Sequence, residues 1–250
     1  MDVSLVVLLV AGAAVLVGAA VQGSVGLGLG LLAAPVFALL DPTLVPGTIL
    51  LVTSVLPVLT SLRELEGVDW RGLGCALTGR VPGTAVGVYV VASYPPAVTA
   101  VVVAVVVLGA VALSVLTWKP RPTPRALLVA GVVSGIGGTA TSIGGPPVAL
   151  LYQRASGATL RSTMGLYFLV GNTVSVTALA VAGEVGVADV RHALLLLPFL
   201  VAGFLLSGPL RRHVAGPRLR VAVLALSATG AVVLLGRTLV EPALRLWNGG

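Results

Sequence analysis

Two glycine-rich stretches inside apolar segments carry the residue types best suited to binding a small anion. The first covers residues 23–30, directly after Gln22, and the second covers residues 142–147, which end in two prolines. Proline in a helix interior breaks or kinks it, and glycine lets an oxyanion approach the backbone closely. A helix that begins at such a break presents free N–H groups and about half a positive charge. The two stretches therefore predict a cradle for a small oxyanion.

Polar side chains near the centres of other apolar segments extend this hypothesis. Arg80 is the only charged residue well inside a predicted span, and such charges are functional candidates whose guanidinium suits anions. The alternatives are ordinary structural roles: close helix packing for the glycines, bonds back to the same helix for the serines, contacts between helices for Asn172, and a snorkelling side chain for Arg80. The predicted substrate-binding residues are Gln22, Ser24, Gly26, Gly28, Thr53, Ser54, Arg80, Ser142, Gly144, Gly145, Asn172 and Thr173.

The titratable residues argue against catalysis and metal binding. All eight carboxylates, together with His192 and His213, fall at predicted span ends or in loops. The single cysteine, Cys75, excludes a disulfide within one chain or a cysteine metal cluster, and we interpret it as a core residue. An intramembrane enzyme needs a base or a metal at membrane depth. We therefore predict no catalytic residue, no metal and no cofactor.

The composition places these residues in a membrane. Hydrophobic residues make up 57% of the 250 residues, charged residues only 9%, and the mean hydropathy is +1.11. Soluble domains carry about 25% charged residues. The net charge of +7 comes from basic residues in short loops, which is the positive-inside pattern rather than a nucleic-acid surface. We also expect the apolar N-terminal segment to stay in the mature protein, because it lacks a basic region and exceeds a signal peptide in length.

The apolar runs predict an all-α membrane protein. Six runs are interpreted as full spans, at about 44–61, 72–92, 97–117, 161–182, 191–209 and 219–238. The segments 3–40 and 126–152 are interrupted by glycine. The second has 27 residues, too few for two crossings of about 20 residues each, and it is favoured as a re-entrant hairpin over one broken helix. For 3–40, a hairpin and two full spans both remain open.

Internal matches predict a duplication. Ser24–Gly26 recurs as Ser142–Gly144, Thr53-Ser54 as Asn172-Thr173, and 67–71 as 186–191, at offsets of about 118 to 120 residues. The first repeat would cover 1–118 and the second 126–250, joined by a cytoplasmic linker at 119–125. A re-entrant segment plus three spans makes an odd number of crossings. The two repeats are therefore expected to be inverted relative to each other, each with its glycine-broken segment and three transmembrane helices.

The charges predict the orientation. One face would receive eleven basic residues and the other only Arg191, Arg237 and Arg245, so the first face is expected to be cytoplasmic and both termini extracytoplasmic. The eleven are Arg63, Arg71, Lys119, Arg121, Arg125, Arg154, Arg161, Arg211, Arg212, Arg218 and Arg220.

These residues resemble a known family. The stretch 135–150, the residues 160–164 leading into Asn172, and the run 23–35 followed by Thr53-Ser54 and the loop at 67–69 are similar to the sulfite exporter TauE/SafE-like permeases. The resemblance covers nearly the whole chain, although the first motif spaces its glycines at every second residue. It implies a bacterial or archaeal inner-membrane carrier of small anions, often sulfur-containing ones such as sulfite or organosulfonates.

The sequence therefore predicts a multi-pass secondary transporter of small anions in the cell inner membrane, working by alternating access of its repeats. A channel-like anion pore and a structural membrane subunit without transport remain as alternatives. The predicted partners are the lipid bilayer and a small anionic solute, not nucleic acid. The substrate, direction, coupling ion and oligomeric state stay open.

Overall fold

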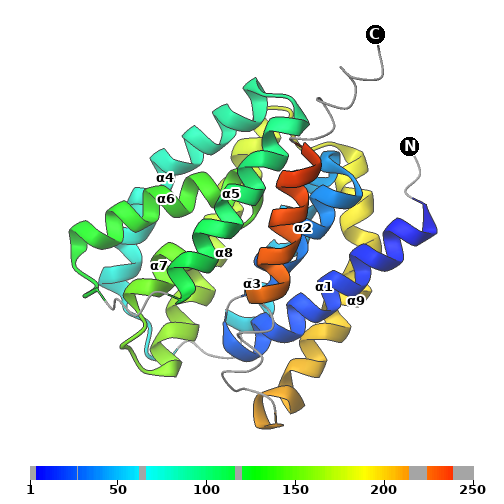
Figure 1. Cartoon of the computed structure of the whole chain (residues 1–250). Helices are drawn as coiled ribbons and strands as arrows, with labels where there is room; N and C mark the ends of the chain where they lie inside the picture. Colours follow the sequence, from blue (N-terminus) through cyan, green and yellow to red (C-terminus); the bar gives the residue numbers. More distant parts are fainter. Residues whose placement is uncertain (1–3, 27, 62–65, 116–119, 214–223, 239–250) are drawn as a thin grey trace.

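Helices make up the architecture of the molecule. The computed structural model describes residues 4–26, 28–61, 66–115, 120–213 and 224–238, and it places helices but no strands in this part of the chain (Figure 1). The helices are α1 Leu5–Val25, α2 Leu29–Leu40, the short 3-10 helix η1 Pro42–Leu44, α3 Gly47–Ser61, α4 Trp70–Ser93, α5 Pro96–Val115, α6 Pro124–Thr141, α7 Gly145–Leu151, α8 Gly157–Val181, α9 Val187–His213 and Leu224–Thr238.

Five of the described helices are long and apolar enough to cross a membrane, namely α1, α4, α5, α8 and α9. Four of them coincide with predicted spans. The predicted span 44–61 is shorter in the structure, because α3 begins only at Gly47 and has 15 residues. The predicted span 219–238 is described only from Leu224 onward. Side chains of Ser4, Asp69, Thr123 and Ser156 cap the first turns of α1, α4, α6 and α8.

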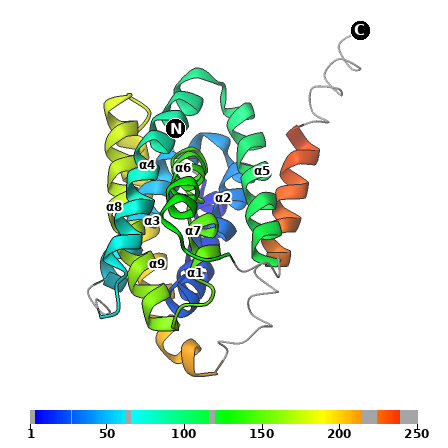
Figure 2. The same ribbon diagram turned by 90° about the vertical axis from the view of Figure 1, so that its left-hand side faces the viewer.

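Each glycine-broken segment forms a long helix followed by a short one that folds back. The helix α1 has 21 residues and α2 has 12, so α2 is only about 18 Å long, less than a hydrocarbon core. The segment 3–40 is therefore not two full spans. In the second segment, α6 has 18 residues and α7 has seven, and α7 packs back against α6 (Figure 2). Tyr152 at the end of α7 reaches Asp69 at the start of α4.

Three helix pairs hold the molecule together. The pair α4–α6 packs backbone to backbone, because a Cβ on Gly79, Gly83 or Gly87 would collide with α6. The pair α1–α9 also packs closely, where Gly203 meets the Leu16 carbonyl. Between the two pairs, α3 packs against α8. The helix Leu224–Thr238 lies beside α5 and reaches Pro35 of α2 through Gly230 (Figures 1 and 2).

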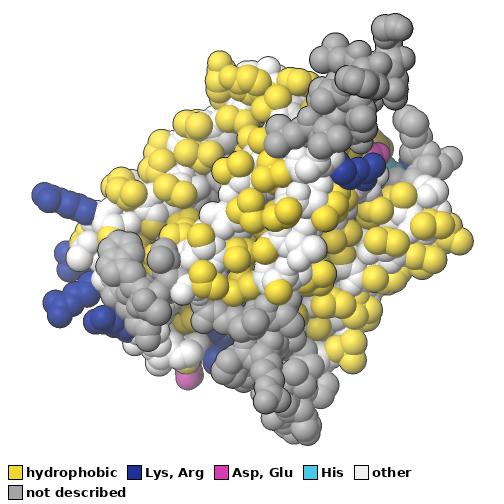
Figure 3. All heavy atoms as spheres, viewed as in Figure 1, with side chains coloured by type: hydrophobic (Ala, Val, Ile, Leu, Met, Phe, Trp, Pro, Cys, Tyr) yellow, Lys and Arg dark blue, Asp and Glu magenta, His cyan; other side chains and the backbone are white. Residues whose placement is uncertain are grey.

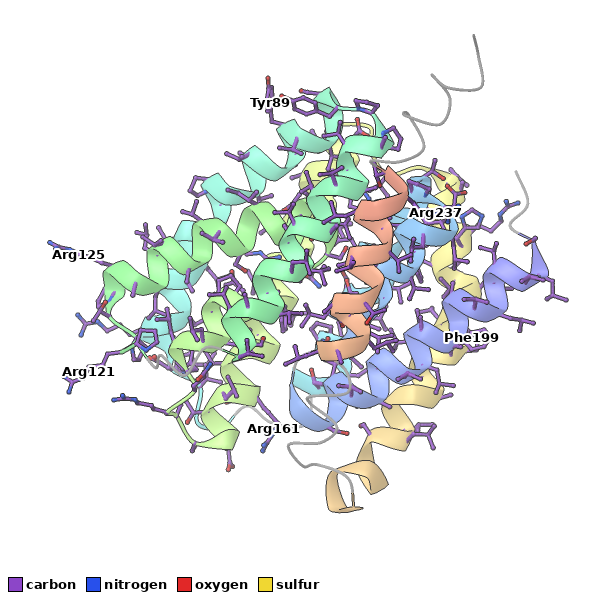
Figure 4. All side chains as sticks on the ribbon, in the orientation of Figure 1. Tyr89, Arg121, Arg125, Arg161, Phe199 and Arg237 are labelled. Atoms are coloured by element: carbon purple, nitrogen blue, oxygen red, sulfur yellow. The ribbon has the colours of Figure 1, made fainter. Side chains whose placement is uncertain are left out.

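The surface is apolar in the middle and charged at the ends. Hydrophobic side chains cover the central body in Figure 3, and basic side chains gather at one end. The labelled residues Arg121 and Arg125 point outward at that end, Arg161 lies lower in the view near the end of α1, and Arg237 lies near the opposite end (Figure 4). Exposed Leu and Val side chains on α1, α5 and α9 fit contact with lipid rather than water. Of the basic residues expected at the ends, Arg63, Lys119, Arg218, Arg220 and Arg245 lie outside the described residues.

Candidate functional site

The two chain breaks end their first helices in the same way. α1 ends at Gly26, with φ 91°, and α6 ends at Ser142, with φ 62°; both lie in the left-handed region. Glycine takes that conformation freely, whereas serine rarely does. The following short helices begin after Gly28 and Gly144. In the first break, Gln22 accepts a hydrogen bond from Leu29 N (3.0 Å) and so ties α1 to the start of α2.

The two breaks meet in the interior. A Cβ on Gly30 would collide with the Ser142 carbonyl, so only glycine permits this approach. Beside this contact lies a cavity of about 30 Å³, room for about one water molecule. Its walls come from both breaks and from α3 and α8. The lining residues are Gln22, Gly28, Gly30, Leu31, Thr53, Ser142, Ile143, Gly144, Gly145, Pro146, Phe168 and Asn172.

Arg80 lies directly behind this cavity and is 1% exposed. Its Nη2 donates to Asn172 Oδ1 (3.2 Å) and to Ser175 Oγ (3.4 Å). Its Nε and Nη1 are buried without a hydrogen-bond partner. The guanidinium carbon lies 5.0 Å from the centre of the Tyr167 ring, within cation–π range. A buried arginine thus has an amide, a hydroxyl and an aromatic ring as neighbours.

Three glycines make room for the guanidinium. A Cβ would lie 3.0 Å from Nη2 if built on Gly138 and 3.1 Å from Nη1 if built on Gly144, and on Gly171 it would collide with the side chain. Two residues connect Arg80 to the cavity. Gly144 lines the cavity and has no side chain to crowd Nη1. Asn172 also lines it, accepts from Nη2 and donates to Thr53 O (3.4 Å).

A second set of hydrogen bonds fixes the wall. Tyr167 OH donates to Ser134 Oγ (2.6 Å), and Ser134 Oγ donates to the Gly144 carbonyl. Thr139 and Ser175 share a hydrogen bond of 2.8 Å beside Arg80. Sequence reasoning missed Tyr167, Ser134 and Ser175. One signal was available, because Ser175 follows Asn172 by three residues and so shares its helix face.

The structure separates the predicted residues into two groups. The cavity contains Gln22, Gly28, Thr53, Ser142, Gly144, Gly145 and Asn172, and Arg80 stands behind it. The other four lie elsewhere. Ser24 bonds to Ala20 O and to Ser207 O of α9, Ser54 bonds to Leu50 O of its own helix, and Gly26 approaches Arg161. Thr173 is exposed and bonds to Leu169 O.

Hydrogen bonds to aspartate join neighbouring helices at two places, one near the start of α8 and one near the start of α3. At the first place Tyr152 OH donates to Asp69 Oδ2 (2.9 Å), and Asp69 N donates to Thr163 of α8 (3.1 Å). Burial and this hydrogen bond raise the pKa of the Tyr152 phenol. At the second place Thr48 of α3 donates to Asp189 Oδ1 (2.8 Å).

The described residues contain no group of three or more His, Cys, Asp or Glu side chains that could hold a metal ion. Cys75 is half-buried on α4 and packs against the cluster that contains Leu73 and Tyr152. The site is therefore built from backbone, hydroxyls, two amides and one guanidinium. Such groups bind anions and position them, but they include no base that would activate a nucleophile.

Comparisons with known proteins agree with this chemistry. The sequence model of the family described as "Sulfite exporter TauE/SafE" matches residues 10–234. A protein of Cupriavidus necator named "Probable sulfite/organosulfonate exporter TauE" is 28% identical over 194 residues, covering 74% of this chain and 73% of that protein. No solved structure matches significantly.

Proposed function

Because the chain belongs to the sulfite exporter TauE/SafE family, whose members are membrane transporters and not enzymes, we propose that it is a secondary transporter of small sulfur-containing anions. The observation that carries this proposal is the buried guanidinium of Arg80, with two unpartnered N–H-bearing nitrogens beside a cavity at two helix breaks. A buried charge at membrane depth is costly and marks a solute pathway. The name of the Cupriavidus necator relative, which mentions sulfite and organosulfonates, supports the substrate class.

The proposal includes two inverted repeats, 1–118 and 126–250, joined by the linker 119–125. The arrangement of helix pairs supports it. The first helix of each repeat packs against the third long helix of the other repeat, as α1–α9 and α6–α4, and α3 packs against its counterpart α8. The end ties match in the same way, with Asp69 near the start of α8 and Asp189 near the start of α3. An inverted duplication accounts for both sets of contacts.

The small size of the site supports alternating access as the proposed mechanism. The cavity of about 30 Å³ has room for about one water molecule, so an oxyanion with a sulfur centre needs it to widen. We propose that two ties keep the site closed: Tyr152–Asp69 between the end of α7 and the start of α4, and Thr48–Asp189 between α3 and α9. Breaking one tie while keeping the other would expose the site to one side at a time, as repeat-built transporters do.

We place the protein in the inner membrane with the end that carries Arg121 and Arg125 in the cytoplasm and both termini outside. The gathering of basic side chains at that end supports this orientation (Figures 3 and 4). Labelling of single cysteines, introduced at Arg121 and at Glu184 of a Cys75→Ser chain, tests it in intact cells. An impermeant maleimide should label position 184 only, and labelling of position 121 would reverse the orientation.

Transport is tested with purified protein in liposomes. Uptake of radiolabelled sulfite, sulfoacetate, taurine and sulfate is measured for the native chain, Asn172→Ala and Arg80→Ala. Both variants should lose at least about tenfold in rate, because a hydrogen bond to a charged group contributes roughly 1.5–3 kcal/mol. Thr78→Ala is the matched control, since Thr78 is exposed on α4 and bonds only to Gly74 O.

The same liposomes separate a carrier from a pore. A carrier saturates with substrate and accelerates when unlabelled substrate is present on the other side, whereas a pore does neither. If none of the anions enters faster than into empty liposomes, the proposal of anion transport fails.

A further inference from the structure

We propose that the single buried charge of Arg80, placed behind an otherwise uncharged cavity, makes this site selective for monovalent anions over divalent ones. This inference rests on the proposed function and specifies its substrate class: sulfonates with one charge and hydrogensulfite, in preference to sulfite and sulfate dianions. The juxtaposition that carries it is the position of Nη1 beside Gly144, a residue of the cavity wall, where a Cβ on Gly144 would lie 3.1 Å from Nη1.

The positive charge of Arg80 is constant in sign and held in position. Arginine keeps its positive charge at all pH values at which proteins are folded. Gly138, Gly144 and Gly171 leave the guanidinium the space that a Cβ at each position would occupy. Tyr167 covers one face, and Asn172 and Ser175 accept from Nη2. The substrate therefore meets one positive charge in every cycle.

The residues that line the cavity add no further full charge to that of Arg80. The lining residues are glycines, apolar side chains, Gln22, Thr53, Ser142 and Asn172, all uncharged. The groups that face Arg80 in the described part of the chain are an amide, a hydroxyl, a tyrosine ring and backbone. No carboxylate hydrogen-bonds to it there. The positive charge of Arg80 is thus not neutralised by a neighbouring carboxylate there and is available to a bound anion.

The helix ends at the two breaks carry partial charges of their own. Each break joins the C-terminal end of one helix to the N-terminal start of the next, as α1 to α2 and α6 to α7. The partial charges at these ends are opposite in sign and about equal, so they largely cancel at the cavity. Pro146 and Pro147 also remove two N–H donors from the start of α7. One unit of positive charge remains.

A monoanion at this site forms a neutral pair, and a dianion leaves one negative charge without compensation. An uncompensated charge near the bilayer centre is unfavourable by about a hundredfold in equilibrium constant. The structure thus ranks anions by charge first and by shape second.

The decisive experiment compares two substrates of nearly equal size in liposomes that contain the native protein. Isethionate (2-hydroxyethanesulfonate) has one charge, and sulfoacetate has a carboxylate in place of the alcohol and so has two. We expect initial uptake of isethionate to exceed that of sulfoacetate by about a hundredfold. Equal uptake of both would overturn the charge inference and leave anion transport standing. If neither these anions nor sulfite enters faster than into empty liposomes, the proposed function fails and the inference with it.

Sulfite provides an internal check, because it changes between monoanion and dianion near neutral pH. Uptake of sulfite should rise as pH falls, in proportion to the hydrogensulfite fraction, whereas uptake of isethionate should stay constant. A parallel change for both substrates would point to a titrating protein group and would contradict the inference.

Variants connect the selectivity to Arg80. Arg80→Lys keeps the charge and should keep the ratio of isethionate to sulfoacetate uptake, even if both rates fall. Arg80→Gln removes the charge and should lower isethionate uptake by about a hundredfold, with Thr78→Ala unchanged. Size-exclusion profiles in detergent report folding. If Arg80→Gln does not fold, the thermal shift of the native protein decides: isethionate should stabilise it more than sulfoacetate at equal ionic strength, and the reverse order would refute the inference.

Discussion

The pairs α4–α6 and α1–α9 use the same packing for different chemistry. Both consist of helices that run in the same direction with backbones in close contact at glycine. In α4–α6 the glycines recur at every fourth residue, at 79, 83 and 87, and the space beside them holds Arg80 and a set of buried hydroxyls. In α1–α9 the corresponding space is filled by Phe199 and Leu200.

Matched positions in the two halves differ in charge and side-chain size. At the offset of 120 residues that relates Asp69 to Asp189, Arg80 corresponds to Leu200. At the offset of 119 that relates Thr53 to Asn172, Gly171 beside Arg80 corresponds to Val52. Leu200 and Val52 are fully buried and belong to one hydrophobic cluster. The buried pair Arg80 and Gly171 in one half thus matches the apolar pair Leu200 and Val52 in the other. Under the proposed duplication, the buried charge of Arg80 is therefore present in one half only.

The largest effect is expected from making the two halves alike. Arg80→Met should reduce anion uptake by about a hundredfold and should raise the unfolding temperature, because replacing a buried charge by an apolar side chain of similar volume is neutral or stabilising by roughly 1–4 kcal/mol. Leu200→Met is the matched change in the other half and should alter stability by less than about 1.5 kcal/mol without affecting uptake. Thermal unfolding in detergent and liposome uptake measure both. Unfolding of Arg80→Met would show that Arg80 is structural.

A double-mutant cycle tests the pairing of Arg80 with Gly171. Gly171→Val alone places a branched side chain against the guanidinium and should destabilise the protein by roughly 1–3 kcal/mol. Combined with Arg80→Leu, it copies the Leu200–Val52 arrangement, and most of that loss should be recovered as a coupling energy of roughly 0.5–3 kcal/mol. Additive effects in thermal or denaturant unfolding would mean that the two halves do not correspond in this way.

The sequence predicts this asymmetry only in part. The apolar runs and glycine breaks follow from hydropathy and backbone chemistry, and so does Arg80 as an isolated intramembrane charge. Helix rotation does not follow, because successive residues point about 100° apart and packing decides which one faces inward. Asn172 therefore lines the cavity while Thr173 beside it is exposed. Tyr167 was missed because aromatic residues are common in apolar helices, and only the fold brings it over Arg80.

The matches between repeats also needed the structure. The sequence aligns Ser24 with Ser142, but Ser24 lies inside α1 and bonds to α9. The residue that ends α1 in the left-handed conformation is Gly26, and Ser142 does so for α6. The structural equivalent of Ser142 is thus two residues beyond the one that the sequence match selects. A short motif cannot detect this shift, because glycine and serine recur on both sides of the break.

Glycine substitutions test the packing that both halves share. Gly83→Ala would drive a methyl group into the Val132 carbonyl, which is backbone and cannot turn aside, so we expect a loss of roughly 1–3 kcal/mol. Gly12→Ala in the other pair meets only the Phe199 ring, 2.8 Å from the new Cβ, and a ring can rotate. A smaller loss is expected there. Equal unfolding temperatures for the two variants would contradict the view that a clash with backbone is harder to relieve than a clash with a side chain.

The smallest effects should come from the ties at the ends of the two pairs. Tyr152→Phe removes the hydroxyl that reaches Asp69 at the start of α4, and Thr48→Val removes the one that reaches Asp189 in α9. Each loss is worth about 1 kcal/mol, roughly a fivefold change in an equilibrium. Because burial and the hydrogen bond to Asp69 raise the pKa of the Tyr152 phenol, the phenol stays protonated and its tie persists through neutral and mildly alkaline pH. If the ties are opposing gates, the two variants should shift the apparent KM for uptake on opposite faces of the membrane, measured in inside-out and right-side-out vesicles. Shifts on the same face would mean that the two ends do not alternate, and the inverted correspondence between α4–α6 and α1–α9 would then describe packing without describing transport.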